Sequence, residues 1–343
     1  MRDWSKLPGK FLSAVCDRLD LSGLFAFNRV CSSWRYSSSL TLKHHLGFLF
    51  IVQKDFSHKG SVWVFSPLQF KFYSMKLPSG IKSGNICGFS DGWLALEDDH
   101  LNLQMLPVCS SVDPVHLPPL PPSDLIDKTD ETSYKTVCMS ADQSVFMAID
   151  RCLYKPGGLY IYRPKHHVEW ILIRIDPYDD LIYFKGLFYA VSGDGRDGRF
   201  TVVDPFLHSS STSNLWTIQI IDTDKPCARG HLVEISGQLR VVCMGLACFF
   251  VKKLENGDLV DTVGELGDHA LLLNRHHSCL VPLSEFPRFK AHHVYAAPDP
   301  YTKFKGNVGY YGGGIPFAFM GDLEYSLACQ YEEAIECRHW LSS

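Results

Sequence analysis

The first part of the chain has a helical pattern of apolar and polar positions. At about 100° per residue, the apolar side chains between residues 8 and 20 fall within about 140° of arc on one helical face. They are Phe11, Leu12, Val15, Cys16 and Leu19. Pro8 suits the first turn of this helix, because the N–H that proline lacks would have no intrahelical partner there.

A second amphipathic helix is predicted from about Ser22 to Trp34. Its apolar positions gather on one half of the helix, with Arg29 and Ser33 opposite and Phe25 outside the apolar half. These positions are Leu21, Leu24, Phe27, Val30, Cys31 and Trp34. Two short helices with such broad apolar faces cannot bury them against each other alone. They need a further surface, which is either the chain's own remaining domain or a partner protein.

After Arg35 the pattern changes to short runs rich in aromatic and β-branched residues, which are typical of strands. The clearest runs are residues 62–65, 93–96, 159–162, 170–175, 200–203 and 215–221. Other runs pair across tight turns at Lys185-Gly186, Ser236-Gly237 and Asn256-Gly257, and Asn-Gly is the strongest short hairpin signal. No long helical stripe separates the strands, so the sequence predicts antiparallel all-β structure rather than a parallel α/β sheet.

Length and charge narrow the class of protein. The chain has 343 residues, 46% of them hydrophobic, which predicts about two domains. The strand-rich part, roughly 300 residues, is too long for one sandwich and fits about six four-stranded propeller blades. The formal charge of −4 favours neither nucleic acid nor an anionic membrane as a partner. The longest central apolar run, residues 246–251, is far short of the ~18 residues that span a bilayer.

The cysteines and the N-terminal segment bear on the compartment. None of the 12 cysteines forms a C-x-x-C pair, so we expect buried thiols rather than a zinc or disulfide framework. The first ten residues carry several charges and no apolar signal segment. We therefore expect a protein of the nucleus and/or the cytoplasm.

Leu7-Pro8, the helical stripe that follows it, and Val30-Cys31-Ser32-Ser33-Trp34-Arg35 occur in order along the chain. Together they resemble the F-box of plant F-box proteins, here residues 1–40. The resemblance implies that this segment binds a Skp-family adaptor, which is itself attached to a cullin. It also implies that eight side chains form or support the binding surface: Leu7, Pro8, Leu12, Val15, Leu19, Val30, Cys31 and Trp34.

A second set of motifs lies in the strand-rich part. They are Gly88-Phe-Ser-Asp-Gly92-Trp93-Leu94, residues 180–191, His231-Leu-Val-Glu234, and residues 266–271 with Asn274-Arg275 and Phe286-Pro287. These motifs resemble the plant KIB-type β-propeller domain, whose members commonly carry an N-terminal F-box. The implied organisation is a small all-α F-box followed by an all-β propeller over residues 45–340, with about six blades of antiparallel strands.

A catalytic alternative rests on Gly88-Phe-Ser90-Asp-Gly92, which satisfies the Gly-x-Ser-x-Gly pattern of hydrolases. That chemistry needs a strained strand-to-helix turn that exposes the serine. The next run, residues 93–96, is a predicted strand, so a hairpin turn explains the motif better. His276-His277 and the other adjacent histidines lack a repeating ligand spacing. We expect no catalytic residue, cofactor or metal.

The leading hypothesis is therefore a non-catalytic substrate-recognition subunit of a Skp–cullin–F-box ubiquitin ligase, with an unknown protein as its target. Since apolar anchors dominate interfaces, Leu7, Leu12 and Trp34 are the expected hot spots of the adaptor contact. One alternative is a propeller scaffold outside the ubiquitin system, in which the helices form an intramolecular cap. The other is a hydrolase that uses Ser90.

Overall fold

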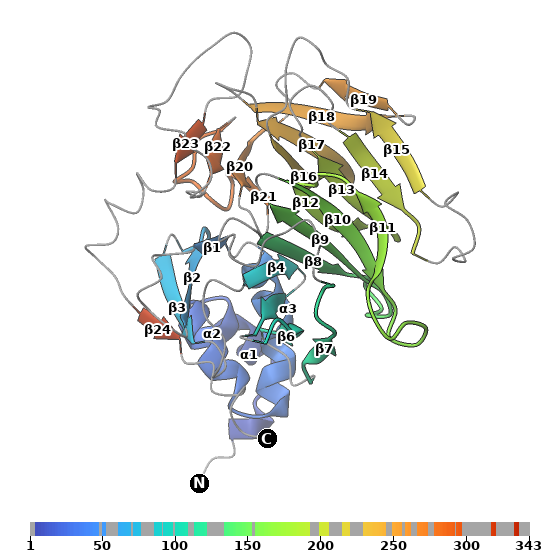
Figure 1. The fold of residues 1–343 in the computed structure, drawn as a ribbon. Helices are drawn as coiled ribbons and strands as arrows, with labels where there is room; N and C mark the ends of the chain where they lie inside the picture. The colour runs from blue at the N-terminus through green and yellow to red at the C-terminus, as the bar shows by residue number, and fades with distance from the viewer. Residues whose placement is uncertain are drawn as a thin grey trace.

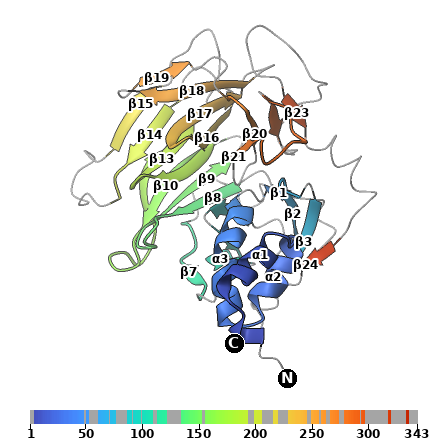
Figure 2. The same ribbon diagram turned by 180° about the vertical axis from the view of Figure 1, so that it is seen from behind.

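The computed structural model describes residues 4–47, 50–52, 61–69, 71–76, 86–90, 92–98, 100–108, 113–121, 134–152, 155–192, 199–205, 215–219, 229–244, 249–255, 258–261, 266–273, 278–291, 293–296, 317–319 and 333–335. The helices gather at one end of the molecule, and small sheets make up the rest (Figures 1 and 2). Within these ranges, no helix has the length and apolar character needed to cross a bilayer.

The N-terminal unit consists of a short 3-10 helix, η1 (Trp4–Lys6), followed by α1 (Gly9–Cys16), α2 (Leu21–Asn28) and α3 (Ser32–Gly47). The prediction of one helix up to Trp34 is wrong, because α2 ends at Asn28. The amides of Arg29 and Val30 donate to carbonyls three residues back, which tightens the last turn. The Nε of Arg35 then donates to the carbonyl oxygen of Asn28, a group that the helix end leaves without an intrahelical partner.

The longest helix, α3, was missed by the sequence pattern, which predicted strand-like structure after Arg35. Its middle is rich in serine, whose hydroxyl competes for backbone groups and lowers helix propensity. In the structure the hydroxyls of Ser37, Ser38 and Ser39 donate to backbone carbonyls one turn earlier, at 2.8–3.1 Å. α3 runs to Gly47 and therefore spans residues 40–45, the interval between the expected F-box (1–40) and the expected propeller (45–340).

The described strands form six four-stranded sheets. In spatial order, the first three are β1 (Phe50–Val52), β2 (Ser61–Ser66), β3 (Lys71–Lys76), β24 (Glu333–Ile335); β4 (Ile86–Ser90), β5 (Trp93–Glu97), β6 (Leu103–Pro107), β7 (Val115–Leu117); and β11 (Ile171–Ile175), β10 (Lys155–Tyr162), β9 (Phe146–Cys152), β8 (Tyr134–Met139). The last three are β12 (Asp180–Phe184), β13 (Leu187–Ser192), β14 (Arg199–Val203), β15 (Leu215–Gln219); β16 (Arg229–Ile235), β17 (Gln238–Met244), β18 (Phe249–Glu255), β19 (Asp258–Asp261); and β21 (Cys279–Pro282), β20 (His269–Leu273), β22 (Val294–Ala296), β23 (Phe317–Phe319).

The predicted hairpins are confirmed. Lys185 and Gly186 join β12 to β13 with φ values of 48° and 88°, and Ser236 and Gly237 join β16 to β17 with 51° and 72°. Two successive positive φ values match the right-handed twist of the flanking strands. Glu255 also pairs with Asp258 across the third predicted turn, whose Asn256-Gly257 lies outside the described residues.

Two sheets depart from the antiparallel prediction. β22 runs parallel to β20 and to β23, and β24 runs parallel to β3. After the β20–β21 hairpin, the chain passes through turns between residues 283 and 291 and returns on the opposite edge of β20. β22, the third strand of this up-down-up path, therefore runs in the same direction as the first strand, β20, and lies beside it. The other four sheets are antiparallel throughout.

The apolar core lies between neighbouring sheets. Since successive strand residues point to opposite faces, adjacent residues enter different clusters, as Phe146 and Met147 do. Each pair of sheets that follow one another along the chain shares such a cluster, and the sixth sheet shares one with the first through Phe65 of β2. One residue from each sheet illustrates these shared clusters. The second and third sheets share the cluster of Trp93 and Phe146, the third and fourth that of Met147 and Phe188, and the fourth and fifth that of Phe200 and Val241. The fifth and sixth sheets share the cluster of Val242 and Leu271, and the sixth and first that of Leu272 and Phe65.

One acidic residue inside this β structure gives a pH prediction. Asp150 of β9 is 5% exposed, and burial raises the pKa of its carboxyl to about 6, an effect that Lys135 opposes and Glu97 reinforces. At Asp150 the folded chain therefore binds more protons than the unfolded chain between about pH 4 and pH 6, so the contribution of this carboxyl to the free energy of unfolding falls as pH rises through this window. We expect Asp150→Asn to reduce this fall by on the order of 2 kcal/mol, as measured by urea unfolding across the pH range.

The matched control is Asp142→Asn. Two serine hydroxyls lower the pKa of the exposed Asp142 carboxyl, so its titration lies below the window and the slope between pH 4 and pH 6 should not change. An unchanged slope in the Asp150→Asn variant would contradict the assigned titration.

Candidate docking site on the N-terminal helices

The apolar stripe of α1 divides into two contact surfaces. Leu12 and Cys16, one helical turn apart, are 1% and 0% exposed and lie in the chain's own core. Phe11 and Val15 form the adjacent row one turn apart, and their side chains are 54% and 44% exposed. A stripe of about 140° is wider than one packing contact requires. Its inner edge packs inside the chain, and its outer edge is exposed.

Trp34 holds η1, α2 and α3 together. Its indole ring lies 4.4 Å from the ring of Phe27, between centroids, and its Nε1 donates to the carbonyl oxygen of Trp4 at 3.1 Å. The side chain is half-buried and packs against the same core as Leu12. Trp34 thus fixes the chain ahead of α1 against the helix that closes the unit.

α2 joins the helical unit to the sheets through one apolar core. Leu21, Leu24, Phe25 and Phe27 are all buried, so Phe25, which the helical pattern placed outside the apolar half, faces the interior as well. Their cluster continues into β2 to β6 through Val64, Tyr73, Ile86, Phe89, Leu94, Leu96 and Leu106. A helix that is apolar on most sides is buried on most sides, and α2 is buried between the other helices and the first two sheets.

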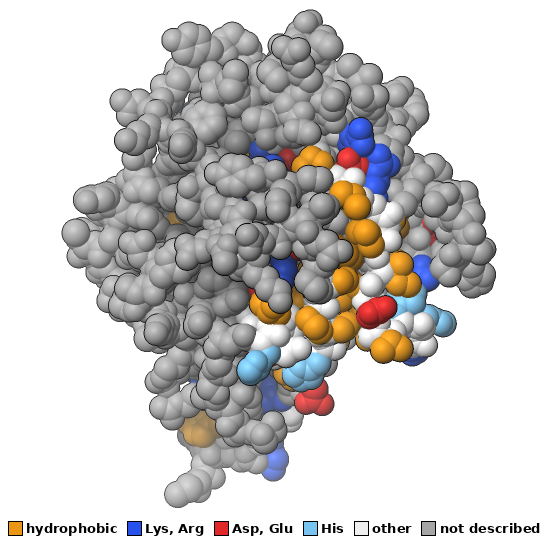
Figure 3. Space-filling model, in the orientation of Figure 1, with side chains coloured by type: hydrophobic (Ala, Val, Ile, Leu, Met, Phe, Trp, Pro, Cys, Tyr) orange, Lys and Arg blue, Asp and Glu red, His pale blue; other side chains and the backbone are white. Residues whose placement is uncertain are grey.

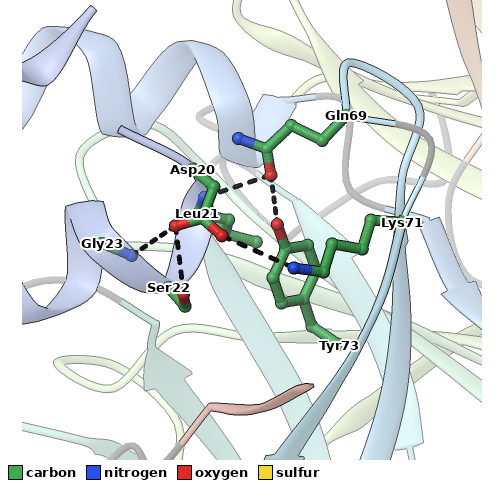
Figure 4. A network of polar contacts seen from close by, with 7 residues as sticks. All are labelled: Asp20, Leu21, Ser22, Gly23, Gln69, Lys71 and Tyr73. Carbon is green, nitrogen blue, oxygen red and sulfur yellow. Dashed lines mark hydrogen bonds and ion pairs between the residues drawn. The ribbon is translucent and has the colours of Figure 1, made fainter. Parts of the chain in front are cut away.

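A polar network reinforces the contact between α2 and the β2–β3 hairpin (Figure 4). The Oε1 of Gln69 accepts a hydrogen bond from the amide of Leu21 at 3.1 Å and another from the hydroxyl of Tyr73. Lys71 lies 3.6 Å from the Oδ2 of Asp20 and above the Tyr73 ring. Tyr73 is fully buried, so its hydroxyl needs a partner inside the protein.

Asp20 begins α2 as its N-cap. Its Oδ1 accepts hydrogen bonds from the amide of Gly23 at 2.8 Å and the hydroxyl of Ser22 at 3.0 Å. Burial alone would raise the pKa of this carboxyl, but these two donors together with Lys71 lower it below its ordinary value. The carboxylate is therefore held in its charged form, which suits both the helix N-terminus and the ion pair with Lys71.

Exposed large apolar side chains gather on the helical unit. Among the described residues, five of them lie before residue 40, with exposed fractions between 44% and 84%: Trp4, Phe11, Val15, Val30 and Tyr36. Single exposed apolar residues are ordinary, but five on so short a segment are a feature of interaction surfaces. Lys10 lies 5.3 Å from the ring centre of Phe11, which adds a positive charge beside this surface.

The eight residues predicted for this site fall into three groups. Pro8, Val15 and Val30 are exposed, whereas Leu12 is buried in the core. Leu7, Leu19, Cys31 and Trp34 are half-buried, and Leu7, Leu19 and Trp34 pack against the core that contains Leu12. Leu12 is therefore wrongly expected as a contact hot spot, because its side chain offers no surface to a partner. The site prediction did not include Trp4, Phe11 and Tyr36, although the α1 stripe already contained Phe11.

The Gly-x-Ser-x-Gly motif lies in a hairpin. Ser90 ends β4 and pairs with Trp93, which begins β5. Gly92, in the turn between them, has a φ of 79°. Strand-turn-strand geometry lacks the helix that a nucleophile elbow requires, so the hairpin interpretation of this motif is confirmed.

Comparison with known proteins agrees with this architecture. A family model described as the KIB1-4 beta-propeller matches residues 64–312. The match covers most of the chain, and the chain therefore belongs to the KIB1-4 β-propeller family.

Its relatives include F-box proteins of Arabidopsis thaliana. F-box protein SKIP23 is 27% identical in an alignment of 288 positions that covers 72% of this chain and 65% of that protein. Putative F-box/kelch-repeat protein At5g24040 is 23% identical in an alignment of 232 positions that covers 60% of each chain. F-box protein At2g14290 is 33% identical over 131 residues, 37% of this chain and 36% of that protein. The chain thus spans less than two thirds of the length of these relatives. The resemblance to plant F-box proteins with a KIB-type β-propeller is confirmed.

The polar network of Figure 4 gives a stability prediction. Gln69→Ala removes the acceptor shared by the Leu21 amide and the Tyr73 hydroxyl, and leaving buried donors unpaired costs about 1–3 kcal/mol. We expect the free energy of unfolding to fall by this amount in chemical denaturation. Gln238→Ala, at an exposed position at the start of β17, is the control and should change stability by a few tenths of a kcal/mol at most. Equal losses in the two variants would refute the role of Gln69.

Proposed function

We propose that this chain is a substrate-recognition subunit of a Skp–cullin–F-box ubiquitin ligase and supplies no catalytic group itself. The observation that carries the proposal is the division of α1 into two faces. One face is buried in the chain's own core, and the other exposes apolar side chains. The F-box proteins among its relatives support the same function.

In this proposal the adaptor is a Skp-family protein that covers the exposed row. Phe11 and Val15 of this row supply contact area together with Val30 after α2, and Pro8 lies at the start of α1. Leu12 and Trp34 act from beneath, because they fix the positions of α1 and η1. Apolar side chains that become fully desolvated contribute most of the affinity of such interfaces.

We also propose that the six sheets are the six blades of a closed ring. What supports closure is the core cluster that the sixth sheet shares with the first, through Phe65, in addition to the clusters shared by sheets that follow one another along the chain. A closed ring presents the loops at its two ends as rigid binding surfaces. One of these ends, or the outer rim, would bind the target protein.

The proposed mechanism is proximity. The adaptor links the chain to a cullin and so to a conjugating enzyme that carries ubiquitin, and the propeller holds a target nearby. Raising the effective concentration of the target lysine accelerates transfer without any nucleophile from this chain. The shared core of α2 with β2 to β6 supports this function, because it fixes the direction from the adaptor surface to the propeller.

The nucleus and/or the cytoplasm is the proposed location. Cys16 and Cys279 are buried free thiols, as proteins in a reducing compartment commonly have.

A second candidate function is a propeller scaffold in which the helices serve as a cap. The core shared by the helices and the first two sheets favours a capping role. That role would leave the exposed apolar row without a purpose, so adaptor binding separates the two candidates.

The adaptor surface gives the first functional prediction. We expect Val15→Lys combined with Val30→Lys to weaken binding of a purified Skp-family adaptor by at least about thirtyfold, as measured by calorimetry, because two charges would be desolvated in an apolar contact. Both positions are exposed, so the melting temperature should stay unchanged. Leu101→Lys, at a 51% exposed apolar position outside the helices, is the control and should bind as the wild type does. Undiminished binding by the double variant would favour the cap.

Target recruitment gives a second prediction. Proximity labelling by the full chain under proteasome inhibition should mark the same target proteins for the wild type and for the Val15→Lys/Val30→Lys variant, whereas the adaptor and cullin should be marked only by the wild type. After the inhibitor is removed, labelled targets should disappear only with the wild type. The point variant is a better comparison than deletion of residues 1–40, because deletion would expose the apolar core beneath α2. Equal lifetimes of all labelled proteins would argue against a role in degradation.

A further inference from the structure

A second exposed apolar region lies far along the chain from the helices, on β11. This strand has the sequence Ile-Leu-Ile-Arg-Ile and forms one edge of its sheet, where β10 is its partner among the described strands. Ile171, Leu172 and Ile175 are 43% to 50% exposed, and Val168, just before the strand, is 95% exposed. Edge strands of soluble proteins usually carry charges or proline as protection against pairing. β11 carries one charge and no proline.

The strand is held firmly at its start. Trp170 is buried, and its Nε1 donates to the carbonyl oxygen of Pro118 at 2.8 Å. Ile173, where the register with β10 shifts by one residue, packs against the core between the third and fourth sheets. The exposed apolar side chains therefore stand on a strand whose position is fixed, so a partner strand would meet an edge that is already ordered.

The charges beside the apolar residues are mainly positive at the C-terminal end of β11 and mixed at its N-terminal end. At its C-terminal end, Arg174 and Arg199 both pair with Asp176, so two guanidinium groups share one carboxylate there. At the other end, Lys165 and His166 are exposed, and Glu169 is the one acidic residue between residues 163 and 175. On the face drawn in Figure 3, apolar side chains form a stripe with basic side chains near one end and histidines near the other.

From these observations we infer that β11 binds an extended segment of a partner protein, which adds a fifth strand to the sheet. The segment has apolar residues facing Ile171, Leu172 and Ile175, and an acidic residue near Arg174 and Arg199. Backbone hydrogen bonds along the edge supply affinity, and the side-chain contacts supply selectivity. If the proposed function holds, this segment belongs to the target for ubiquitination. Only this identification of the partner rests on the proposed function; the binding of an extended segment to β11 does not.

Charge argues against a second copy of this chain as the occupant. In antiparallel self-pairing, the end with Arg174 and Arg199 of one copy would meet Lys165 and Glu169 of the other, whose opposite charges offset each other and so offer no net attraction. In parallel self-pairing, the end with Arg174 and Arg199 would meet its own equivalent. Like charges opposite one another destabilise strand pairs, so an acidic partner segment fits better than a homodimer.

The test uses the full chain and a phage-displayed library of random peptides of about twelve residues, long enough to pair with the whole strand. We expect selected peptides with alternating apolar residues and an acidic residue toward one end. As synthetic probes in fluorescence anisotropy, they should bind Leu172→Lys at least about tenfold more weakly than the wild type. Leu101→Lys, equally apolar and exposed in the wild type, is the matched control and should bind them normally.

Weaker binding by Leu172→Lys could also come from misfolding of that variant, so a second measurement changes the peptide and keeps the wild-type chain. N-methylation of alternate backbone amides of a selected peptide, or replacement of its acidic residue by lysine, should each weaken binding at least about tenfold. Selected peptides that bind Leu172→Lys and the methylated forms unchanged would overturn the inference, as would a chain dimer that Leu172→Lys dissolves. The assay contains no adaptor, so its outcome is independent of whether the helices bind one.

Discussion

The apolar contact between α2 and the first two sheets is the constraint on which the rest of the structure depends. Leu24 and Phe25 of α2 lie in the same buried cluster as Tyr73 of β3 and Leu94 of β5. Burial of large apolar side chains is worth about 1.5–3 kcal/mol each, so separating the helices from the sheets would cost far more than a single hydrogen bond. The helical unit is therefore part of the β structure's own core.

This constraint explains how the two exposed apolar regions can work together. The row on α1 and the edge of β11 lie on elements that are each anchored from within, the first through Leu12 and Cys16 and the second through Trp170. A partner on one region would therefore be held at a fixed direction from a partner on the other. Fixed geometry is what a proximity mechanism requires, because effective concentration falls steeply when two sites cannot be engaged together.

Much of the architecture could be predicted from local sequence. The β hairpins followed from Lys185-Gly186 and Ser236-Gly237, where the residue types report the backbone directly. α3 could not be predicted in this way, because its serines satisfy their hydroxyls on their own helix and hide the apolar period. The parallel pairing of β22 with β20 depends on where the chain crosses the sheet, and short three-residue strands carry no sequence signal of that path.

The sequence indicated which helices carry the candidate site but not which of their side chains are exposed. Amphipathic spacing identified the stripe of α1, but a period alone cannot separate a face buried inside the chain from a face exposed for a partner. Phe11 and Leu12 are adjacent in sequence and similar in chemistry, yet one is 54% exposed and the other 1%. Only the position of α1 against the other helices and the sheets decides between them.

Native-state hydrogen exchange tests most directly whether the helices and the first sheets form one unit. In low concentrations of denaturant, the amides of α2 (21–28) and of β3 (71–76) should exchange through one opening, with the same free energy and the same dependence on denaturant. If α2 instead opened at a lower free energy while β3 stayed protected, the helices would be a separate module and the account would be contradicted.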